Sequence, residues 1–276
     1  MHVSAPASSA NLGPGFDCLA LAVDLPFELA TAADAPAEFH QVEPRHPAAV
    51  AFVAAGGDPE VELCWRSPIP PGRGLGFSGA ARVAGSHLAG LLDGLDETSA
   101  RDGAFRIAAE LEGHPDNAAA SAYGGLTVAA GEQVLSVSVP ADLALFAWSP
   151  PTTTSTNSSR ATLPEQVPME DAVFSLGRAA LWVAAMSTGD LSVLRTACQD
   201  RLHQPPRLAA RDDSRSVLEH LLGMDVVLAA WLSGSGPTVA ALVPADVEHV
   251  ALIDGLPGEG HSRVVPISPT GCAAHS

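Results

Sequence analysis

The part of this 276-residue chain richest in potential chemistry is the glycine-rich segment 70–80, Pro-Pro-Gly-Arg-Gly-Leu-Gly-Phe-Ser-Gly-Ala. Its glycines permit positive φ angles and let the backbone come close to a ligand. The small residues that follow predict a helix over 78–92, whose first N–H groups form an anion site. Arg73 would add a fixed cation, and the Ser78 hydroxyl could bind a phosphate or a metal ion. The segment predicts a phosphate-binding loop; the alternative is an ordinary strand-to-helix turn.

The sequence contains no lysine, so all 14 basic residues are arginines, against 31 acidic residues and a net charge of −17. This absence excludes a Walker-type phosphate loop, the strand lysine of protein kinases and a Schiff-base lysine for pyridoxal phosphate. The acidic balance argues against nucleic acid and against an anionic membrane surface as partners. Any triphosphate would be held by arginine, by backbone N–H groups or by a metal ion.

A tight glycine turn near the N-terminus carries Asn11 and Asp17. Small polar groups in such a turn can bind the ammonium group of a ligand, or they can simply satisfy the turn's own N–H groups. From the residues alone both interpretations stay open.

A second polar cluster, residues 112–117, reads Glu-Gly-His-Pro-Asp-Asn and joins two predicted helices. Its glycine and proline would end one helix and begin the next, so the polar side chains could be simple caps. They could also converge at a helix start, where Asp116 would act as a base or positioning group and Asn117 would hold a substrate hydroxyl. A lone His114 without a partner is not assigned to a metal.

Two arginines follow polar loops: Arg160 lies four residues after Thr156, and Arg207 ends the segment 200–207. A pair of guanidinium groups can clamp a carboxylate, whereas each alone could be a solvated surface residue. The glycine turn 233–237 is either a plain hairpin or a backbone wall close to a ligand.

Short β-type runs mix with helical patterns along the chain. Strands are expected at 62–65, 126–129, 134–139, 143–148, 226–232, 239–243 and 263–267, and helices at 48–55, 78–92, 100–112 and 171–186. Because the alternation is not strict, the pattern favours an α+β architecture. The Pro/Thr/Ser-rich segment 149–160 indicates a loop near a boundary between two lobes.

The four cysteines, at 18, 64, 198 and 272, show no CxxC spacing. This disfavours a zinc site and predicts free thiols in a reducing compartment. The first ten residues lack a basic region with an apolar run, and the apolar stretch 226–243 is interrupted by a glycine turn. The sequence therefore predicts a cytoplasmic enzyme without a membrane segment.

In their order along the chain, these segments resemble the homoserine kinases of the GHMP kinase superfamily. The likeness covers nearly the whole chain and rests on the segments 6–17, 70–80, 112–125, 155–164, 200–207 and 232–239. Two residues depart from the family's Gly-Leu-Gly-Ser-Ser-Ala loop. Phe77 stands in place of the first serine and Gly79 in place of the alanine. The Phe77 ring would either point away from the phosphates or fill the nucleotide site.

The resemblance implies a two-lobed GHMP-kinase fold of the α+β class. Residues 1–140 would form an N-terminal lobe with left-handed βαβ-type, ribosomal-protein-S5-like topology, and residues 141–276 a C-terminal α/β sandwich lobe. The implied activity is ATP-dependent phosphorylation of L-homoserine to O-phospho-L-homoserine in threonine biosynthesis. The alternatives are a GHMP-type kinase of another small hydroxylated metabolite and an amino-acid-binding pseudokinase that has lost ATP binding. A homodimer is left open.

The resemblance also implies roles for individual residues. ATP would be wrapped by Pro70, Pro71, Gly72, Arg73, Gly74, Leu75, Gly76, Phe77, Ser78, Gly79 and Ala80. The substrate-binding residues would be Asn11 and Asp17 at the amino group, Arg160 and Arg207 at the carboxylate, and His114 and Asn117. The catalytic residues would be Asp116, Asn117, Thr156 and Arg160. A Mg²⁺ ion would be held by Ser78, with Glu110 or Glu112 as a carboxylate ligand.

Overall fold

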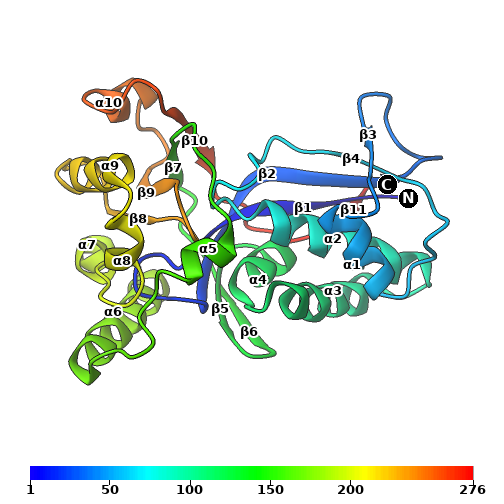
Figure 1. Ribbon diagram of the computed structural model, residues 1–276, viewed down its shortest axis with the longest axis horizontal. Helices are drawn as coiled ribbons and strands as arrows, with labels where there is room; N and C mark the ends of the chain where they lie inside the picture. The colour runs from blue at the N-terminus through cyan, green and yellow to red at the C-terminus, as the bar shows by residue number, and fades with distance from the viewer. Residues whose placement is uncertain (276) are drawn as a thin grey trace.

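The computed structural model describes residues 1–275, which form two antiparallel sheets with helices packed on them (Figure 1). The strands of the first sheet are β1 (His2–Ala10), β2 (Leu19–Thr31), β3 (His40–Gln41), β4 (Leu63–Arg66), β5 (Leu126–Ala130), β6 (Gln133–Val137) and β11 (Ala273–His275). Its order is β11-β1-β2-β4-β3, and β5 pairs with both β2 and β6. The second sheet, in the order β10-β7-β9-β8, contains β7 (Leu143–Ser149), β8 (Ala229–Leu232), β9 (Val239–Pro244) and β10 (His261–Pro266).

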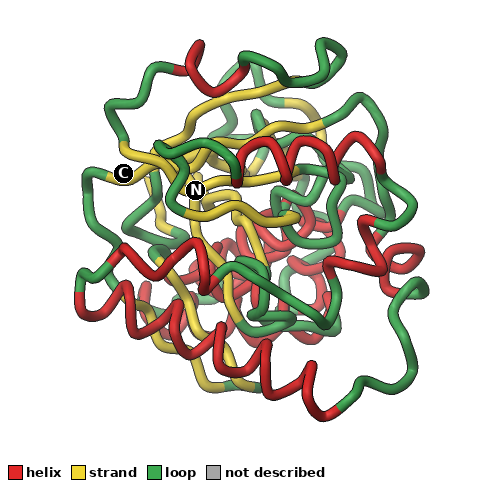
Figure 2. Tube along the Cα trace, turned by 90° about the vertical axis from the view of Figure 1, so that its left-hand side faces the viewer, coloured by secondary structure: helices red, strands yellow, loops and turns green. Residues whose placement is uncertain are grey.

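The helices fall into two groups that correspond to the two sheets. The first lobe contains α1 (Pro47–Ala54), α2 (Phe77–Leu92), α3 (Glu97–Glu112) and α4 (Asp116–Tyr123). The second contains α5 (Thr156–Arg160), α6 (Met169–Thr188), α7 (Leu194–Ala197), α8 (Gln204–Leu208), α9 (Asp212–Leu222) and α10 (His249–Ile253). Figure 2 faces the second lobe and shows helices along its outside, with strands running through the middle of the view. The two-lobed α+β prediction is confirmed.

The predicted helices correspond to α1, α2, α3 and α6, and the predicted strands to β4 to β10. The two longest strands, β1 and β2, were not predicted. β1 reads HVSAPASSA and is buried over nearly all its length. Small and polar residues fill it without the alternation that marks a half-buried strand, so periodicity could not reveal it.

The division at residue 140 falls in the link between β6 and β7, but the chain does not stay with the second sheet to its end. After β10 it returns to the first sheet, where β11 pairs with β1 in the register Val3↔Ala274. Residues 273–275 therefore pair with the first sheet, although the sequence-based division places them in the C-terminal lobe. A strand that closes the edge of a distant sheet leaves no local sequence signal.

One hydrophobic core runs through both lobes. A single cluster of buried side chains includes Leu29 and Phe105 of the first lobe and Leu145, Trp182 and Leu242 of the second. The two lobes are therefore parts of one packed body. Among residues 1–275, no helix combines the length and apolar character that crossing a membrane requires.

Candidate active site

A cleft lined by both lobes brings most of the predicted residues together. The first lobe contributes Asn11, Asp17, Pro70, Gly72, Arg73, Gly74, Gly76, Phe77, Ser78, Gly79, Glu112, His114, Asp116 and Asn117. The second contributes Thr154, Thr156, Arg160, Arg207, Gly234 and Ser235. These residues come from distant parts of the chain, so the cleft exists only in the folded protein.

The glycine loop before α2 adopts the conformation that its sequence predicts. Gly72, Gly74 and Gly76 have φ values of 67°, 80° and 69°. A Cβ atom at Gly74 would lie 2.3 Å from the Ser233 carbonyl oxygen, and one at Gly76 would lie 2.1 Å from Ser8 Oγ. Glycine is therefore required at both positions, by backbone conformation and by close packing.

Helix α2 begins directly after this loop, and its N-terminus faces the cleft. Gly76 is the N-cap, and within residues 1–275 no side chain caps the helix. The first-turn N–H groups thus offer a site for an anion. Of the predicted loop residues, Pro71, Leu75 and Ala80 do not line the cleft, and the last two are buried in the core.

The Phe77 ring packs into an aromatic cluster on the sheet side of the loop. It meets the rings of Phe27, His46 and Trp65 edge-on, at centroid distances of 5.6, 5.8 and 5.6 Å. These contacts direct the ring toward the hydrophobic core, while the residue still forms part of the cleft wall.

Gly79 allows α2 and the start of α4 to approach closely. A Cβ atom at this position would lie 3.0 Å from the Cβ atom of Asn117. The departure from alanine therefore has a packing reason that the sequence did not reveal.

The turn between β1 and β2 holds Asp17 against Arg160 of α5. Asn11 and Asp17 have left-handed φ values of 72° and 54°. The Asn11 amide donates to the Gly234 carbonyl (2.9 Å) and accepts from the Asp17 backbone N–H (3.1 Å). Both Asp17 carboxylate oxygens accept hydrogen bonds from Arg160, at 2.8 and 2.9 Å.

Arg207 lies in the same cleft and is nearly fully buried. Burial lowers the pKa of its guanidinium to about 10, so it stays charged at neutral pH. The guanidinium carbons of Arg160 and Arg207 are each 5.2 Å from the centroid of the Phe16 ring. The structure thus brings together the two arginines that the sequence could only propose as a pair.

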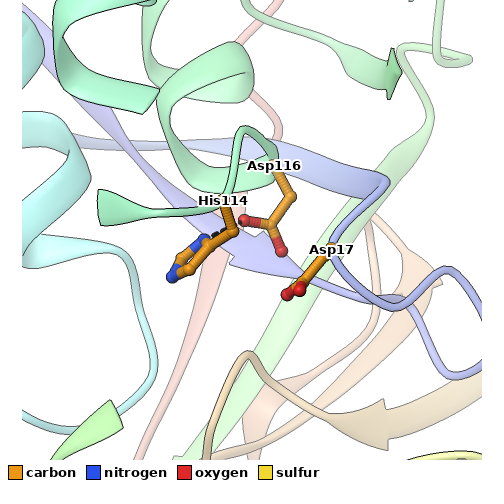
Figure 3. Close-up of side chains that lie close together, drawn as sticks. All are labelled: Asp17, His114 and Asp116. Atoms are coloured by element: carbon orange, nitrogen blue, oxygen red, sulfur yellow. Dashed lines mark hydrogen bonds and ion pairs between the residues drawn. The ribbon is translucent and has the colours of Figure 1, made fainter. Parts of the chain in front are cut away.

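His114 and Asp116 are buried at the start of α4 (Figure 3), and the half-buried Asn117 follows them. Asp116 Oδ1 lies 2.7 Å from His114 Nδ1 and accepts from the Asn117 backbone N–H at 2.8 Å. Burial alone would lower the pKa of His114, but the hydrogen bond and charge of Asp116 outweigh it, and the pKa is raised. Ser8 Oγ donates to Asn117 Oδ1 at 2.9 Å.

The residues predicted for a metal ion divide between two places. Ser78 Oγ donates to Glu112 Oε1, and the Arg82 guanidinium contacts both groups. Glu110 is exposed and lines a separate surface depression, so the structure does not bring it to Ser78. Thr156, the first residue of α5, lines the cleft with its side chain exposed.

Sequence reasoning missed Phe16 and Arg82 as parts of the site. Phe16 lies inside the motif 6–17, but only the polar residues of that motif indicated a role in binding. Arg82 follows Ser78 by one helical turn, a spacing that places both side chains on one helix face. That spacing was the available signal.

The fold and this cleft define a class, the GHMP kinases. Residues 42–125 match the family model described as the GHMP kinases N terminal domain. The solved structure of homoserine kinase from Cytophaga hutchinsonii superimposes with a TM-score of 0.82 at 23% identity, covering 99% of this chain and 96% of that one. Mevalonate kinase from Methanococcus jannaschii gives a TM-score of 0.67 at 11% identity, covering 97% and 98%.

Sequence identity narrows the class to one family. The homoserine kinase of Thermus thermophilus is 41% identical over 257 residues, which cover 88% of this chain and 87% of that protein. The homoserine kinase of Streptomyces coelicolor is 37% identical over 266 residues, covering 89% and 85%. The chain belongs to the homoserine kinase family.

Proposed function

We propose that this chain is a homoserine kinase that transfers the γ-phosphoryl group of ATP to the side-chain hydroxyl of L-homoserine, with O-phospho-L-homoserine and ADP as products. The single observation that carries the proposal is the charge arrangement of the cleft. One carboxylate, Asp17, and two guanidinium groups, Arg160 and Arg207, lie beside an uncapped helix N-terminus. That arrangement fits a small zwitterion next to a polyanion.

The recognition of the amino acid rests on these opposite charges. Asp17 and the Asn11 side chain bind the ammonium group, and Arg160 and Arg207 bind the carboxylate. Arg160 is paired with Asp17 in this structure. When the substrate binds, this ion pair within the protein is replaced by two ion pairs with the substrate, one from Asp17 to the ammonium group and one from Arg160 to the carboxylate. Each hydrogen bond to a charged group contributes about 1.5–3 kcal/mol, which favours an amino acid over a hydroxy acid that lacks the ammonium group.

The triphosphate is held without any lysine. The backbone N–H groups of the loop and of the first turn of α2 face the cleft, and Arg73 adds a positive charge at its rim. Main-chain donors at a helix N-terminus bind phosphate through both hydrogen bonds and the helix dipole.

The Ser78 hydroxyl and the Glu112 carboxylate fit a Mg²⁺ ion, which prefers oxygen ligands and commonly takes one or two protein groups besides phosphate oxygens. When bound, Mg²⁺ neutralises charge that develops on the phosphates. Arg82 contacts the same Glu112 carboxylate, so the ion and this guanidinium compete for it. Asp17, His114 and Asp116 also lie close together, but their existing pairs assign them to the substrate.

The chemical step is an in-line displacement at the γ-phosphorus. The homoserine hydroxyl oxygen forms the new bond to phosphorus and releases its proton to solvent, the bond to the β–γ bridging oxygen breaks, and ADP leaves. Asn117 positions the hydroxyl, and Asp116 accepts a hydrogen bond from it through Oδ2, the oxygen turned toward Asp17 (Figure 3). Thr156 and Arg160 also line the cleft. Positioning and charge neutralisation supply most of the rate enhancement.

The packing of Phe77 argues against the pseudokinase alternative. Its ring packs against Phe27, His46 and Trp65. These contacts bury the ring outside the proposed phosphate site. The second candidate is a kinase of another small hydroxylated metabolite, because enzymes that share one fold can act on different substrates.

A coupled ADP-release assay tests the proposal directly. Purified protein is expected to release ADP with L-homoserine and Mg²⁺ together, and not with either alone. The acceptor panel is L-homoserine, threonine, shikimate, pantoate and mevalonate. A higher kcat/KM for any acceptor other than homoserine would replace the proposed substrate. No turnover with any acceptor, together with calorimetric binding of homoserine but not of ATP-Mg²⁺, would favour the pseudokinase.

We also propose a cytoplasmic location, because all four cysteines are free thiols in the structure and such thiols suit a reducing compartment. The homodimer stays a prediction.

A further inference from the structure

His203 belongs to the segment 200–207 and contacts Arg207. Its side chain is fully buried between the loop that follows β1 and the start of α8. Its Nε2 atom is 2.6 Å from the Gly13 carbonyl oxygen, and its Nδ1 atom is 3.0 Å from Arg207 Nη1. The imidazole thus joins the substrate-binding turn of the first lobe to an arginine of the second.

These two partners determine the tautomer of the ring. A carbonyl oxygen can only accept a hydrogen bond, and a guanidinium group can only donate one. Nε2 must therefore carry the proton, and Nδ1 must offer its lone pair to Arg207. Burial lowers the pKa of His203 to about 4, which agrees with a neutral ring.

The loop around His203 is held rigidly by a buried carboxylate. Asp200 accepts hydrogen bonds from the backbone N–H groups of Leu202, His203 and Gln204, at 2.8, 2.9 and 2.8 Å. On its other side the imidazole stacks on the Phe16 ring at a centroid distance of 5.2 Å. Phe16 in turn contacts both arginines. The position of the His203 ring is therefore determined by three kinds of contact: the backbone hydrogen bond to Asp200, the hydrogen bonds of the two ring nitrogens and the stacking on Phe16.

The hydrogen bonds of Arg207 leave one side of its guanidinium group available. Both of its bonds to the described residues start from Nη1, one to His203 and one to the Gly234 carbonyl at 3.0 Å. Among these residues the buried Nε finds no acceptor. Nε and Nη2 form the side-on fork of an arginine, the geometry that binds a carboxylate through two parallel hydrogen bonds.

We propose that His203 is a positioning residue for substrate recognition, which anchors Nη1 of Arg207 through its Nδ1 lone pair and so presents the Nε/Nη2 fork to the substrate carboxylate. The inference rests on the proposed function, because it needs a carboxylate-bearing substrate in the cleft. It goes beyond that function by assigning specificity to a group that does not touch the substrate.

The test compares three variants by steady-state kinetics. His203→Leu removes both ring hydrogen bonds, whereas His203→Asn keeps an acceptor near the position of Nδ1 and loses the contact with Gly13. His87→Leu is the matched control, because His87 is fully buried on α2 and its ring nitrogens form no hydrogen bond with any described residue. Each enzyme is assayed with L-homoserine and with L-homoserine carboxamide, whose amide cannot form the ion pair. Thermal melting checks that each variant is folded.

We expect His203→Leu to raise KM for L-homoserine by about tenfold or more, with KM for ATP unchanged. The ratio of kcat/KM for L-homoserine to that for the carboxamide should fall by a similar factor. His203→Asn should recover part of the ratio, and His87→Leu should keep the wild-type ratio.

Equal losses of kcat/KM for both substrates in His203→Leu would overturn the inference, because they would indicate a merely structural role. An Asn variant as impaired in the ratio as the Leu variant would overturn it too. If His203→Leu does not fold, His203→Asn is compared with wild type in the ratio of kcat/KM for L-homoserine to that for the carboxamide. A ratio that falls by the full factor expected for the Leu variant then overturns the inference. Wild-type protein that turns over no homoserine would refute the proposed function, and the inference with it, before any variant is made.

Discussion

At the scale of single residues, four groups of the cleft are arranged in two pairs of opposite charge. Asp17 is paired with Arg160, and Asp116 with His114. A buried or half-buried charge without a partner is costly, and each of these two pairs removes such a cost. The members of such a pair can exchange each other for the charged groups of a zwitterionic ligand, because that ligand carries both a positive and a negative charge.

The pair of His114 and Asp116 predicts a pH-dependent contribution to stability. Because the pKa of His114 is raised in the folded state, the pair stabilises the fold fully below the unfolded-state pKa of about 6.5. The contribution is lost as the pH rises through the higher folded-state pKa. We therefore expect His114→Gln to be destabilised relative to wild type at acidic pH, with the difference shrinking as the pH rises.

Denaturant unfolding of both proteins at a series of pH values from about 5.5 to 8.5, the range in which histidine titrates, measures this difference. A gap in unfolding free energy that stays constant over the series would show that the charge of His114 does not contribute.

At the scale of elements, the site depends on how α2 meets α4. The N-terminus of α2 presents its N–H groups to the cleft, while the start of α4 presents Asp116 and Asn117. Their close approach at Gly79 brings the glycine loop 70–80 together with Asp116 and Asn117 in one cleft. An alanine at position 79 would therefore fit only if Asn117 shifted by a few tenths of an ångström.

Substitution of two helical glycines by alanine separates packing from helix propensity. A Cβ atom added at Gly103, in the interior of α3, would meet no atom of the neighbouring described residues within 4 Å, so Gly103→Ala should stabilise the protein by about 0.5–1 kcal/mol. At Gly79 the contact of 3.0 Å with Asn117 should cancel that gain and lower kcat through displacement of Asn117. Chemical unfolding and steady-state kinetics check both. A Gly79→Ala protein that is stabilised as much as Gly103→Ala, with unchanged kcat, would contradict this account.

At the scale of the whole molecule, the end of β1 joins the two lobes. Ser9 Oγ accepts a hydrogen bond from Trp231 Nε1 (3.0 Å) and lies 2.8 Å from Ser233 Oγ, and all three residues are buried. The Gly234 backbone N–H donates to the Ala10 carbonyl at 3.1 Å. With the shared hydrophobic core, these contacts couple the cleft to the stability of both lobes.

This coupling predicts that the lobes unfold together. The far-UV circular dichroism and tryptophan fluorescence transitions should coincide in wild type. Trp231→Phe should shift both by the same amount, at a cost of about 0.5–1.5 kcal/mol for the lost hydrogen bond, because Ser9 Oγ keeps Ser233 Oγ as a partner. Two separated transitions, or a shift in one signal alone, would mean that the lobes are independent.

Much of the site was accessible from the sequence because its features are local. Positive φ at the glycines 72, 74 and 76, the helix that follows, and the left-handed glycine that ends α3 each depend on a few neighbouring residues. The strands β1 and β2 were not predicted, because their burial depends on elements packed on both faces and leaves no alternation in the sequence.

By itself, then, the sequence determined the conformation of the glycine loop, the helix start behind it, the absence of any lysine from the site and the set of polar residues available for a substrate. Only the tertiary structure decided which of those residues meet. It paired Asp17 with Arg160, turned Phe77 toward the core, left Glu110 outside the cleft and returned β11 to the first sheet. Those outcomes depend on packing between segments far apart in the chain, where the free energy of burial and of charge pairing outweighs local preference.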